Sequence, residues 1–206
     1  ADIHGLNISS QQQYDAFGRL THRYDGNGNL VRTHYDDVGR VVATVGQSQA
    51  GEIRVESTYD AFGRVLQVLD AMGNASTTVY DDAERKITVT TPMGLTSTTY
   101  LNEHGQAERL VANDGTETRM EYDFNGNLLK TYVNGVLQGE QQYDARDQVR
   151  FAFDANGHQA EFHMDAAGRV YQTDRSVDGG VLSQSMVFDA FGAVIESTDA
   201  SGRVVT

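Results

Sequence analysis

The stretch YDAFGRV at residues 59–65 decides the fold, because most other segments of the chain are variants of it. Close copies stand at residues 14–20 (YDAFGRL) and 188–194 (FDAFGAV). An Asp side chain in this position accepts hydrogen bonds from backbone N–H groups a few residues on, and the glycine supplies the left-handed conformation that closes a type I turn into a hairpin. Strand formers flank the turn, so each copy predicts a strand, a four-residue turn and a second strand.

The turn aspartate recurs at a regular spacing along the chain. Full-step copies fall at positions 15, 36, 60, 81, 102, 123, 144, 165 and 189, with Asn at 102, and half-step copies at 25, 70, 91, 112, 154 and 199. Full steps measure 21 residues except for two of 24, and each half-step copy follows a full-step copy by ten residues. Such a period predicts a repeat architecture. The 24-residue steps contain enlarged loops at 47–51 and 178–180, where a hairpin array accommodates insertions.

The candidate site residues are the structural turn residues of this repeat. The aromatic residues before the turns are Tyr14, Tyr24, Tyr35, Tyr59, Tyr80, Tyr122 and Tyr143. The turn acids are Asp15, Asp25, Asp36, Asp60, Asp70, Asp81, Asp123, Asp144, Asp154, Asp165, Asp189 and Asp199. The turn glycines are Gly18, Gly28, Gly39, Gly63, Gly73, Gly126, Gly157, Gly168, Gly192 and Gly202.

Arginines follow the glycine position, namely Arg19, Arg40, Arg64, Arg85, Arg169 and Arg203. A planar guanidinium beside a turn can pair with a neighbouring Asp or stack on a neighbouring Tyr, which predicts a ladder between adjacent repeats. Two copies lack the glycine and have Glu84 and Asp147 instead. Because Asp tolerates the left-handed region better than Glu, distorted geometry is expected at 81–84.

Seventeen strands are expected between the turns, over a repeat array spanning residues 14–206. They are 19–24, 29–35, 40–46, 52–59, 64–69, 74–80, 85–90, 95–101, 106–111, 116–122, 127–132, 136–143, 148–153, 158–164, 169–175, 181–188 and 193–198. Residues 1–13 form a polar lead-in, with a partial strand around Ile3, Leu6 and Ile8. Pro92 occupies the second position of a turn, where no ladder N–H is needed, and Asn134-Gly135 predicts a two-residue hairpin.

The fold class predicted from these strands is all-β, an antiparallel sheet of hairpin repeats. Strand 19–24 alternates Leu20, His22 and Tyr24 with residues 19, 21 and 23, which differs from the continuous apolar run of a strand buried on both faces. Because twist accumulates in sheets of more than about ten strands, the array is expected to curve and spiral.

Composition narrows the function classes. The chain has 206 residues, a net charge of −13 and no cysteine, which excludes disulfides and thiolate sites. The sequence contains no apolar run of about 18 residues, so no membrane span is predicted. Its first residues lack the basic and apolar regions of a signal peptide. Twelve of the 19 Asp residues are turn residues, so the acidity follows from turn chemistry. It argues against binding to a nucleic-acid backbone, which requires a Lys/Arg surface.

Catalytic and metal sites were weighed against these structural roles. The histidines His22, His34, His104, His158 and His163 match no metal-ligand spacing, so no metal is expected. The many carboxylates could suggest a glycosidase pair or calcium sites, but each of these Asp residues already has a structural role in a turn. The serines at 9, 10, 183 and 185 lack the glycines of a nucleophile elbow. We therefore expect a protein that is not an enzyme and has no cofactor.

The Tyr-Asp-x-x-Gly-Arg-Leu/Val motif at this spacing resembles the YD repeats of the Rhs family, over roughly residues 14–206. That family includes polymorphic bacterial toxins, the B and C components of insecticidal toxin complexes and the teneurins. The resemblance implies a large β-shell that encloses a cavity, which in bacterial members holds a toxic C-terminal domain. The Asp-Pro-x-Gly-Leu signature that accompanies self-cleavage is not found here, so neither autoproteolysis nor toxicity is assigned to any residue.

The expected function is that of a structural shell segment that encapsulates a toxin or other cargo polypeptide. Its expected partners are the remainder of its own shell, the enclosed polypeptide and further copies of itself through exposed strand edges. As part of a larger parent protein it is expected to be secreted or on the bacterial cell surface. The alternative is a module that binds carbohydrate or a cell surface, which ten Tyr favour and the absence of Trp disfavours. A hydrolase would require clustered carboxylates in a pocket.

Overall fold

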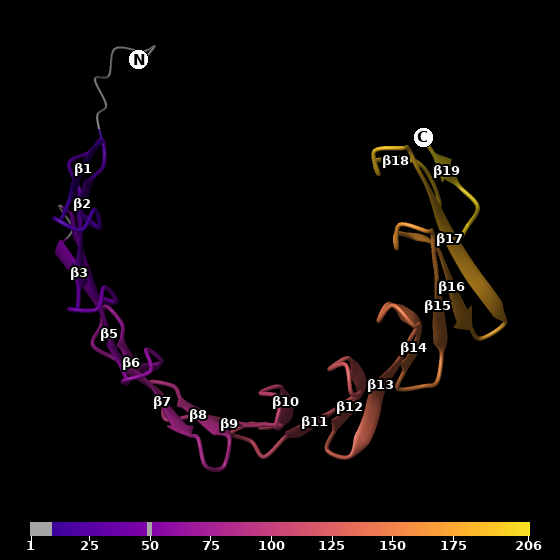
Figure 1. The fold of residues 1–206 in the computed structure, drawn as a ribbon, viewed down its shortest axis with the longest axis horizontal. Coiled ribbons are helices and arrows are strands. Elements are labelled where there is room, and N and C mark those ends of the chain that lie inside the picture. Colours follow the sequence, from indigo (N-terminus) through magenta and orange to yellow (C-terminus); the bar gives the residue numbers. More distant parts are fainter. Residues whose placement is uncertain (1–9, 49–50) are drawn as a thin grey trace, which may run out of the picture. The chain divides into compact units, whose positions relative to one another are not determined.

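The computed structural model describes residues 10–48 and 51–206, and these residues form nineteen β-strands and no helix (Figure 1). They fall into two compact units. The first unit contains the described residues up to Ala83 together with Ile87–Ser97. The second contains Glu84–Lys86 and Thr98–Thr206. In both units the hairpins follow one another in chain order. The all-β, antiparallel hairpin array predicted from the repeat is thereby confirmed.

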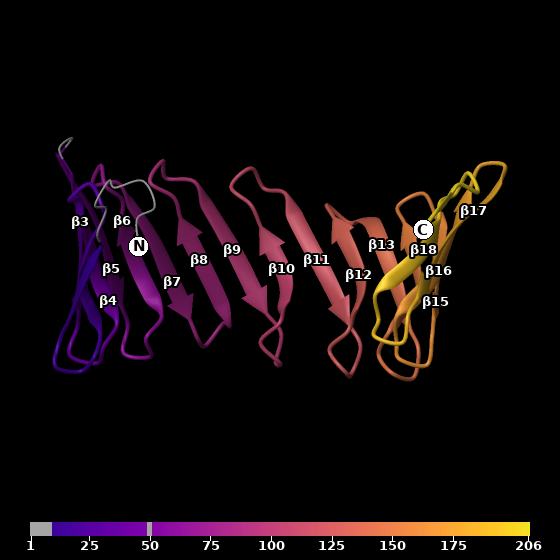
Figure 2. The same ribbon diagram turned by 90° about the horizontal axis from the view of Figure 1, so that it is seen from above.

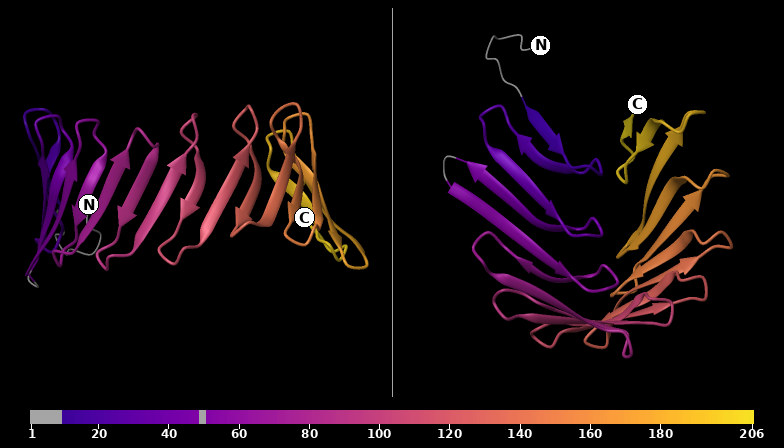
Figure 3. Two further views of the ribbon diagram at one scale, coloured as in Figure 1. Left: turned by 90° about the horizontal axis from the view of Figure 1, so that it is seen from below. Right: turned by 60° about the vertical axis from the view of Figure 1, so that its left-hand side comes forward.

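The first unit is built from consecutive antiparallel strands. Its strands are β1 (Gln11–Tyr14), β2 (Leu20–Tyr24), β3 (Leu30–Tyr35), β4 (Val41–Ser48), β5 (Gly51–Tyr59), β6 (Val65–Leu69), β7 (Ala75–Asp81) and most of β8 (Lys86–Thr90). From β1 to β7 each strand pairs with the next in sequence, without a crossover (Figure 3). Every pairing is therefore local in sequence, and each repeat is held mainly by its immediate neighbours.

The second unit has the same organisation. It contains β10 (Ala107–Val111), β11 (Glu117–Tyr122), β12 (Leu128–Val133), β13 (Val136–Tyr143), β14 (Val149–Asp154), β15 (Gln159–Met164), β16 (Val170–Val177), β17 (Gly180–Phe188), β18 (Val194–Thr198) and β19 (Val204–Val205). From Thr98 onward, strand β9 (Thr96–Leu101) also belongs to this unit, and it pairs with β10. Strands β10 to β13 lie side by side, and hairpin turns join them at both ends (Figure 2).

The strand boundaries agree with the predicted ones to within two residues, because the turns define them. Strand β1 was not predicted, since its sequence QQQY is polar and lacks apolar alternation. It forms because β2 offers it a backbone edge, with Gln11 opposite Tyr24. The two-residue strand β19 was also missed. The partial strand expected around Ile3, Leu6 and Ile8 lies outside the described residues.

The repeated turn is a three-residue hairpin loop whose last residue is left-handed. In the turn at 60–63, the N–H of Gly63 donates to the Asp60 carbonyl (3.1 Å), and the N–H of Asp60 donates to the Arg64 carbonyl (2.9 Å). Gly63 has a φ of +82°. This is a type I turn closed by a left-handed residue. The same pair of backbone hydrogen bonds closes both full-step and half-step turns, and Asp147 takes the glycine position with a φ of +58°.

The turn predicted at 81–84 is wrong by one residue. Asp81 is the last residue of β7, the turn covers residues 82–85, and the left-handed residue is Arg85 (φ +48°), not Glu84. Without a glycine, the three-residue loop has no residue suited to the left-handed position, so the chain uses a four-residue loop instead. Its carbonyl at Arg85 accepts a hydrogen bond from the N–H of Leu101 (2.8 Å).

The enlarged loops expected in the two 24-residue steps are also wrong. The extra residues lengthen the strands, because β16 and β17 continue to a two-residue connection in which Val177 lies opposite Gly180. In the other long step Gln47 and Ser48 belong to β4 and Gly51 begins β5. Residues 49 and 50 lie outside the described part of the chain. A longer ladder adds backbone hydrogen bonds, whereas a longer loop would add only conformational entropy.

A β-bulge follows the full-step turn in every hairpin of this kind for which the register is described. The extra residue always lies three positions after the glycine position: Thr21, Val42, Leu66, Glu108, Leu129, Arg150, Tyr171 and Ile195. Among the half-step hairpins with a described register, only β12–β13 has such a shift, with Gln138 as the extra residue, and the others run without one. Bulges increase the local right-handed twist, so in most strands the two ends differ in geometry.

Neither unit has a second layer of structure over its sheet. Among the described residues the only fully buried hydrophobic side chains are Ala43 and Val45, at 5% and 2% exposure. Large apolar side chains such as Ile53 remain more than half exposed. Stability must therefore come from contacts between adjacent hairpins within the sheet.

The corrected turn generates a test. Replacing Arg85 with Gly should stabilise the protein by about 0.5–1 kcal/mol, because it removes a side chain from the left-handed region. Glu84→Gly is the matched control and should give no gain. Urea denaturation of both variants measures the difference in the free energy of unfolding. A gain in stability from Glu84→Gly would instead support the turn at 81–84 that the sequence predicts.

Candidate functional site

The structural turn residues assemble into a ladder that links one hairpin to the next, and each rung begins inside a single turn. Oδ1 of Asp60 accepts hydrogen bonds from the N–H groups of Phe62 and Arg64, both 2.9 Å long. Its Oδ2 accepts a hydrogen bond from Nε of Arg64 at 2.6 Å. The carboxylate therefore fixes the turn backbone and also orients the side chain that follows the turn. The same double backbone contact occurs at Asp15, Asp25, Asp36, Asp70, Asp123, Asp144, Asp154, Asp165, Asp189, Asp199 and Asn102.

Turn hydrogen bonds lower the pKa of carboxyls such as Asp15, Asp25 and Asp123. At Asp15 the backbone N–H of Arg19 is the largest cause, and the pKa lies below the ordinary 3.8. The backbone N–H of Asn127 has the same effect on the pKa of Asp123. A lowered pKa in the folded state means that this stabilisation is present above about pH 4 and is lost as the pH falls further. The turns are thus fully charged at neutral pH.

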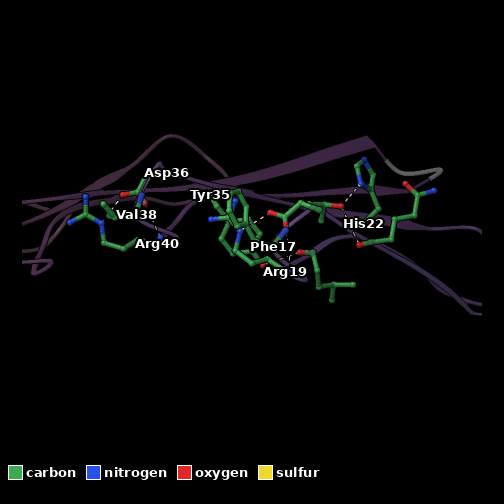
Figure 4. A network of polar contacts seen from close by, with 11 residues as sticks. Phe17, Arg19, His22, Tyr35, Asp36, Val38 and Arg40 are labelled. Carbon is green, nitrogen blue, oxygen red and sulfur yellow. Dashed lines mark hydrogen bonds and ion pairs between the residues drawn. The ribbon is translucent and has the colours of Figure 1, made fainter.

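In the first unit, arginines connect each full-step turn to the next. The Arg19 guanidinium lies over the Tyr35 ring, 4.6 Å from its centre (Figure 4). Arg40 repeats this contact with Tyr59 at 4.8 Å and donates from Nη1 to the Asp60 carbonyl at 2.9 Å. Each guanidinium therefore binds its own Asp and also the next repeat.

Arg64 extends the series to the turn that the sequence analysis misplaced. Its guanidinium lies 4.2 Å from the centre of the Tyr80 ring. Its two terminal nitrogens donate to the two carboxylate oxygens of Asp82 at 2.6 and 3.1 Å. This bidentate contact lowers the pKa of Asp82. Asp82, and not Asp81, is the acid that Arg64 binds.

In the second unit, amide side chains do most of this bridging. Nε2 of Gln106 donates to the Gly126 carbonyl (2.8 Å), and Nε2 of Gln148 donates to the Gly168 carbonyl (3.3 Å). Nδ2 of Asn127 reaches Oδ1 of Asp147 at 2.8 Å. The amides were missed because only arginines were considered at this position. Aligning the full-step turns on the residue after the glycine position would have revealed a side-chain donor in all of them except the turn at 189–192, which has Ala193.

The full-step glycines have a second role as the surface on which this donor lies. A Cβ atom on Gly168 would lie 2.4 Å from Nε2 of Gln148, and one on Gly126 would lie 3.1 Å from Nε2 of Gln106. The half-step glycine Gly157 has the same conformation, yet a Cβ there would meet nothing within 4 Å. Gly126 and Gly168 are therefore required both for their φ angle and for space, whereas a Cβ on the full-step glycines Gly18 and Gly105 would meet nothing within 4 Å.

The tyrosines bind the bulge of the preceding hairpin. The Tyr122 hydroxyl donates to the Ala107 carbonyl at 2.7 Å, and that carbonyl immediately precedes the bulge residue Glu108. The hydroxyl of Tyr143 makes the equivalent contact with Leu128 at 2.9 Å. Tyr35 and Tyr59 do so in the first unit, at 2.9 and 2.7 Å. A bulge disrupts the ladder locally, so the hydroxyl supplies a donor where strand pairing is interrupted.

Most half-step turns lack this connection. Asn29 and Asn74 follow the glycine there, and each donates only to its own turn acid, Asp25 at 2.7 Å and Asp70 at 2.9 Å. Arg203 contacts its acid, Asp199, only through its backbone N–H.

The predicted ladder therefore runs mainly along the full-step turns. Arg85, in the full-step turn at 82–85, stacks on no ring within the described residues, but its Nε donates to the Leu101 carbonyl at 3.2 Å, just before the next full-step turn. At the half-step turns, His158 reaches the neighbouring hairpin, where it lies 3.8 Å from Asp178.

The histidines considered as metal ligands are dispersed over the two units. His22 contacts Thr21 (3.1 Å), and His104 contacts Glu103 of the same turn (3.5 Å). His163 approaches Asp174 at 2.8 Å, and the Asp174 carboxylate is also bonded by Ser183. In residues 10–48 and 51–206 no group of three or more His, Asp or Glu side chains is arranged to hold a metal ion. None of the described segments is a helix that could span a membrane.

Removing a tyrosine hydroxyl tests the contact with the bulge. Tyr122→Phe should destabilise the protein by about 0.5–1.5 kcal/mol, because a carbonyl loses its donor while the ring remains. Tyr132→Phe is the matched control in the next strand, since the Tyr132 hydroxyl makes no hydrogen bond within the described residues. Equal urea midpoints for the two variants would show that the hydroxyl contact contributes nothing.

A pair of glycines with the same φ separates conformation from space. Gly168→Ala and Gly157→Ala should each cost about 1 kcal/mol, since both glycines are left-handed, at +80° and +82°. Gly168→Ala should cost about 1 kcal/mol more, because it displaces Gln148 from the Gly168 carbonyl. Introducing Gln148→Ala into both variants should remove this excess. If Gly168→Ala still cost more than Gly157→Ala without Gln148, the proposed role of Gly168 in leaving space for the Gln148 side chain would be contradicted.

The chain was compared with known proteins. The RHS Repeat family model matches residues 14–49 and 59–100. Comparison with curated proteins gave no match. The fold is similar to that in the crystal structure of TcdB2-TccC3, with a TM-score of 0.71, 14% identity, and coverage of 92% of this chain and 12% of that one.

Two further structures show the same similarity. The Photorhabdus luminescens Tc holotoxin pore, in a TccC3 mutant form, gives a TM-score of 0.75 at 14% identity over 92% of this chain and 11% of that one. TcdB2-TccC3 without its hypervariable C-terminal region gives 0.71 at 13% identity over 94% and 12%. The chain thus spans about one-eighth or less of these proteins. The RHS repeats over residues 14–49 and 59–100 support membership of the Rhs/YD-repeat family, and the structural similarity shows that the chain shares the fold of these proteins.

Proposed function

We propose that this chain is a non-enzymatic wall segment of an Rhs-type shell that encloses a toxin or other cargo polypeptide. The observation that carries the proposal is the ladder of full-step turns. It joins successive repeats through backbone pairing, through a guanidinium or amide side chain in most of them, and through a tyrosine hydroxyl in four of them. Such a structure forms a continuous hydrogen-bonded sheet, which suits a barrier more than a catalyst.

The comparison with TcdB2-TccC3 supports a role as wall and not as cargo. The match covers 94% of this chain in a structure that lacks the hypervariable C-terminal region. The similarity therefore lies outside that region. We infer that the chain corresponds to the repeat-built part of a longer parent, which is secreted or displayed on the bacterial surface.

The turn tips support contact with the remainder of that shell. Phe17, Phe62 and Phe191 occupy the same position in three full-step turns and are 84%, 81% and 98% exposed. Turn tips are usually polar, and recurring exposed aromatic rings mark surfaces that other parts of an assembly cover. Strand edges at the ends of the array would pair with flanking repeats in the parent, or with another copy of the chain.

Deleting one doublet in the full-length parent tests the proposal. Removing residues 123–143 takes out one full-step turn and one half-step turn and rejoins equivalent positions of the repeat. We expect the deletion to permit expression but to expose the C-terminal domain, because the neighbouring strands lose their partners. Limited proteolysis measures that exposure, and Tyr132→Phe, which removes a hydroxyl that makes no hydrogen bond within the described residues, serves as the control.

Two results would refute the proposal. One is equal protection of the C-terminal domain in the parent and in the deletion variant. The other is toxicity or hydrolase activity from the 206-residue chain alone, because a wall segment carries no activity of its own.

A further inference from the structure

The junction between the hairpins β14–β15 and β16–β17 differs from the other junctions in the described chain, because histidine–carboxylate contacts cross it. His163 on β15 lies 2.8 Å from Asp174 on β16. His158, which immediately precedes β15, lies 3.8 Å from Asp178 in the turn between β16 and β17. The other described histidines contact no carboxylate of a neighbouring hairpin.

His158 occupies a position that other repeats fill with a group that does not titrate. It follows the glycine of a half-step turn, as Asn29 and Asn74 do. Its Nδ1 lies 3.1 Å from Oδ2 of its turn acid Asp154, in the same way that those amides contact theirs. The imidazole is longer than an amide, so Nε2 also faces Asp178 of the adjacent hairpin.

We propose that this junction is a proton-sensitive joint: in mild acid, charged His158 ties the tip of β16–β17 to β14–β15 beside the His163–Asp174 contact, and above neutral pH this tie weakens. The inference does not depend on the proposed shell function, because it concerns contacts within the second unit only.

The charged groups around His158 favour its protonated form. Asp154 faces it from the end of β14 and Asp178 from the β16–β17 turn, while Arg175 of β16 lines the same hollow. The side-chain hydrogen bond to Asp154 is the largest cause that raises the pKa of His158 above its usual 6.5. A raised pKa in the folded state means that the contact contributes fully below pH 6.5 and is lost as the pH rises through the higher value.

A second contact lies beside His158 in the same junction. Hydrogen bonds from Ser183, Gln172 and His163 hold the pKa of Asp174 at about 2. Glu161 lies 3.9 Å from His163 on the same strand and is paired with Arg150 of β14. The change that adds charge attraction across the joint in mild acid is the protonation of His158.

The joint holds one of the two longest hairpins of the chain. Strands β16 and β17 have eight and nine residues and end at the exposed Asp178. The outer part of this hairpin extends beyond the ordinary repeat, so few other cross-hairpin contacts hold its tip. Its local opening is consequently the property that these contacts should control.

Hydrogen exchange of the 206-residue chain at pH 5.5 and pH 8 tests the inference. The readout is the protection of β16–β17 amides divided by that of the β10–β11 hairpin, which cancels the intrinsic pH dependence of exchange. Each exposed ion pair should change local opening roughly two- to fivefold. We therefore expect the ratio to fall by that factor or more at pH 8.

Variants assign the effect to His158. His158→Asn reproduces the residue found at the equivalent turns, so it should fold and lose the pH dependence. His104→Asn, which alters a histidine within a single turn, should behave like the parent chain. Imidazole NMR titration of His158 provides a second measurement that needs no variant. A ratio that does not change with pH, or an unchanged pH dependence in His158→Asn, would overturn the proposal.

Discussion

The rest of the structure depends on one constraint: an aspartate must hold a tight turn that ends in a left-handed residue. Oδ1 of the aspartate binds two backbone N–H groups, which fixes the turn, and Oδ2 remains available for the side chain after the glycine. Because most turns have this geometry, the chain reverses after each short strand. A sequence that repeats this turn every ten or eleven residues can only form a succession of short antiparallel strands.

A single-layer sheet needs a substitute for a hydrophobic core, and the ladder between repeats provides it. Only two apolar side chains are fully buried in the described residues. Cohesion comes instead from the guanidinium or amide that reaches the next turn and from the tyrosine hydroxyl that reaches the preceding bulge. These contacts are individually modest but recur in nearly every repeat, so stability grows with the number of neighbours. This is a suitable basis for a wall that extends far beyond this segment.

The differences between repeats matter as much as their similarity. In the first unit arginines bridge the turns, whereas in the second Gln106, Asn127 and Gln148 do so with shorter, uncharged groups. The donor function is retained although the residue type changes. At His158 the same substitution introduces a group that titrates near neutral pH, so one junction gains a property that the others lack. A regular scaffold thus allows local variation without loss of the fold.

Most of the architecture could be predicted from the amino-acid sequence, because its determinants are local. The period of the aspartates and glycines placed the turns, and the residues between them placed seventeen of the nineteen strands. The Rhs/YD-repeat resemblance rested on the same motif. Asp147 in a glycine position and the two-residue turn at Asn134-Gly135 were also predictable, since each depends on the φ preference of one or two residues.

The tertiary structure decided what depends on partners distant in the sequence. The β1 strand forms only because β2 offers an edge, and the turn after β7 shifts to 82–85, where Asp82 meets a guanidinium from a turn 18 residues earlier. The bulges, their tyrosine donors and the amide rungs are likewise pairings across 15 to 20 residues. No local preference encodes them, because each is determined by which side chain the neighbouring hairpin brings within hydrogen-bonding distance.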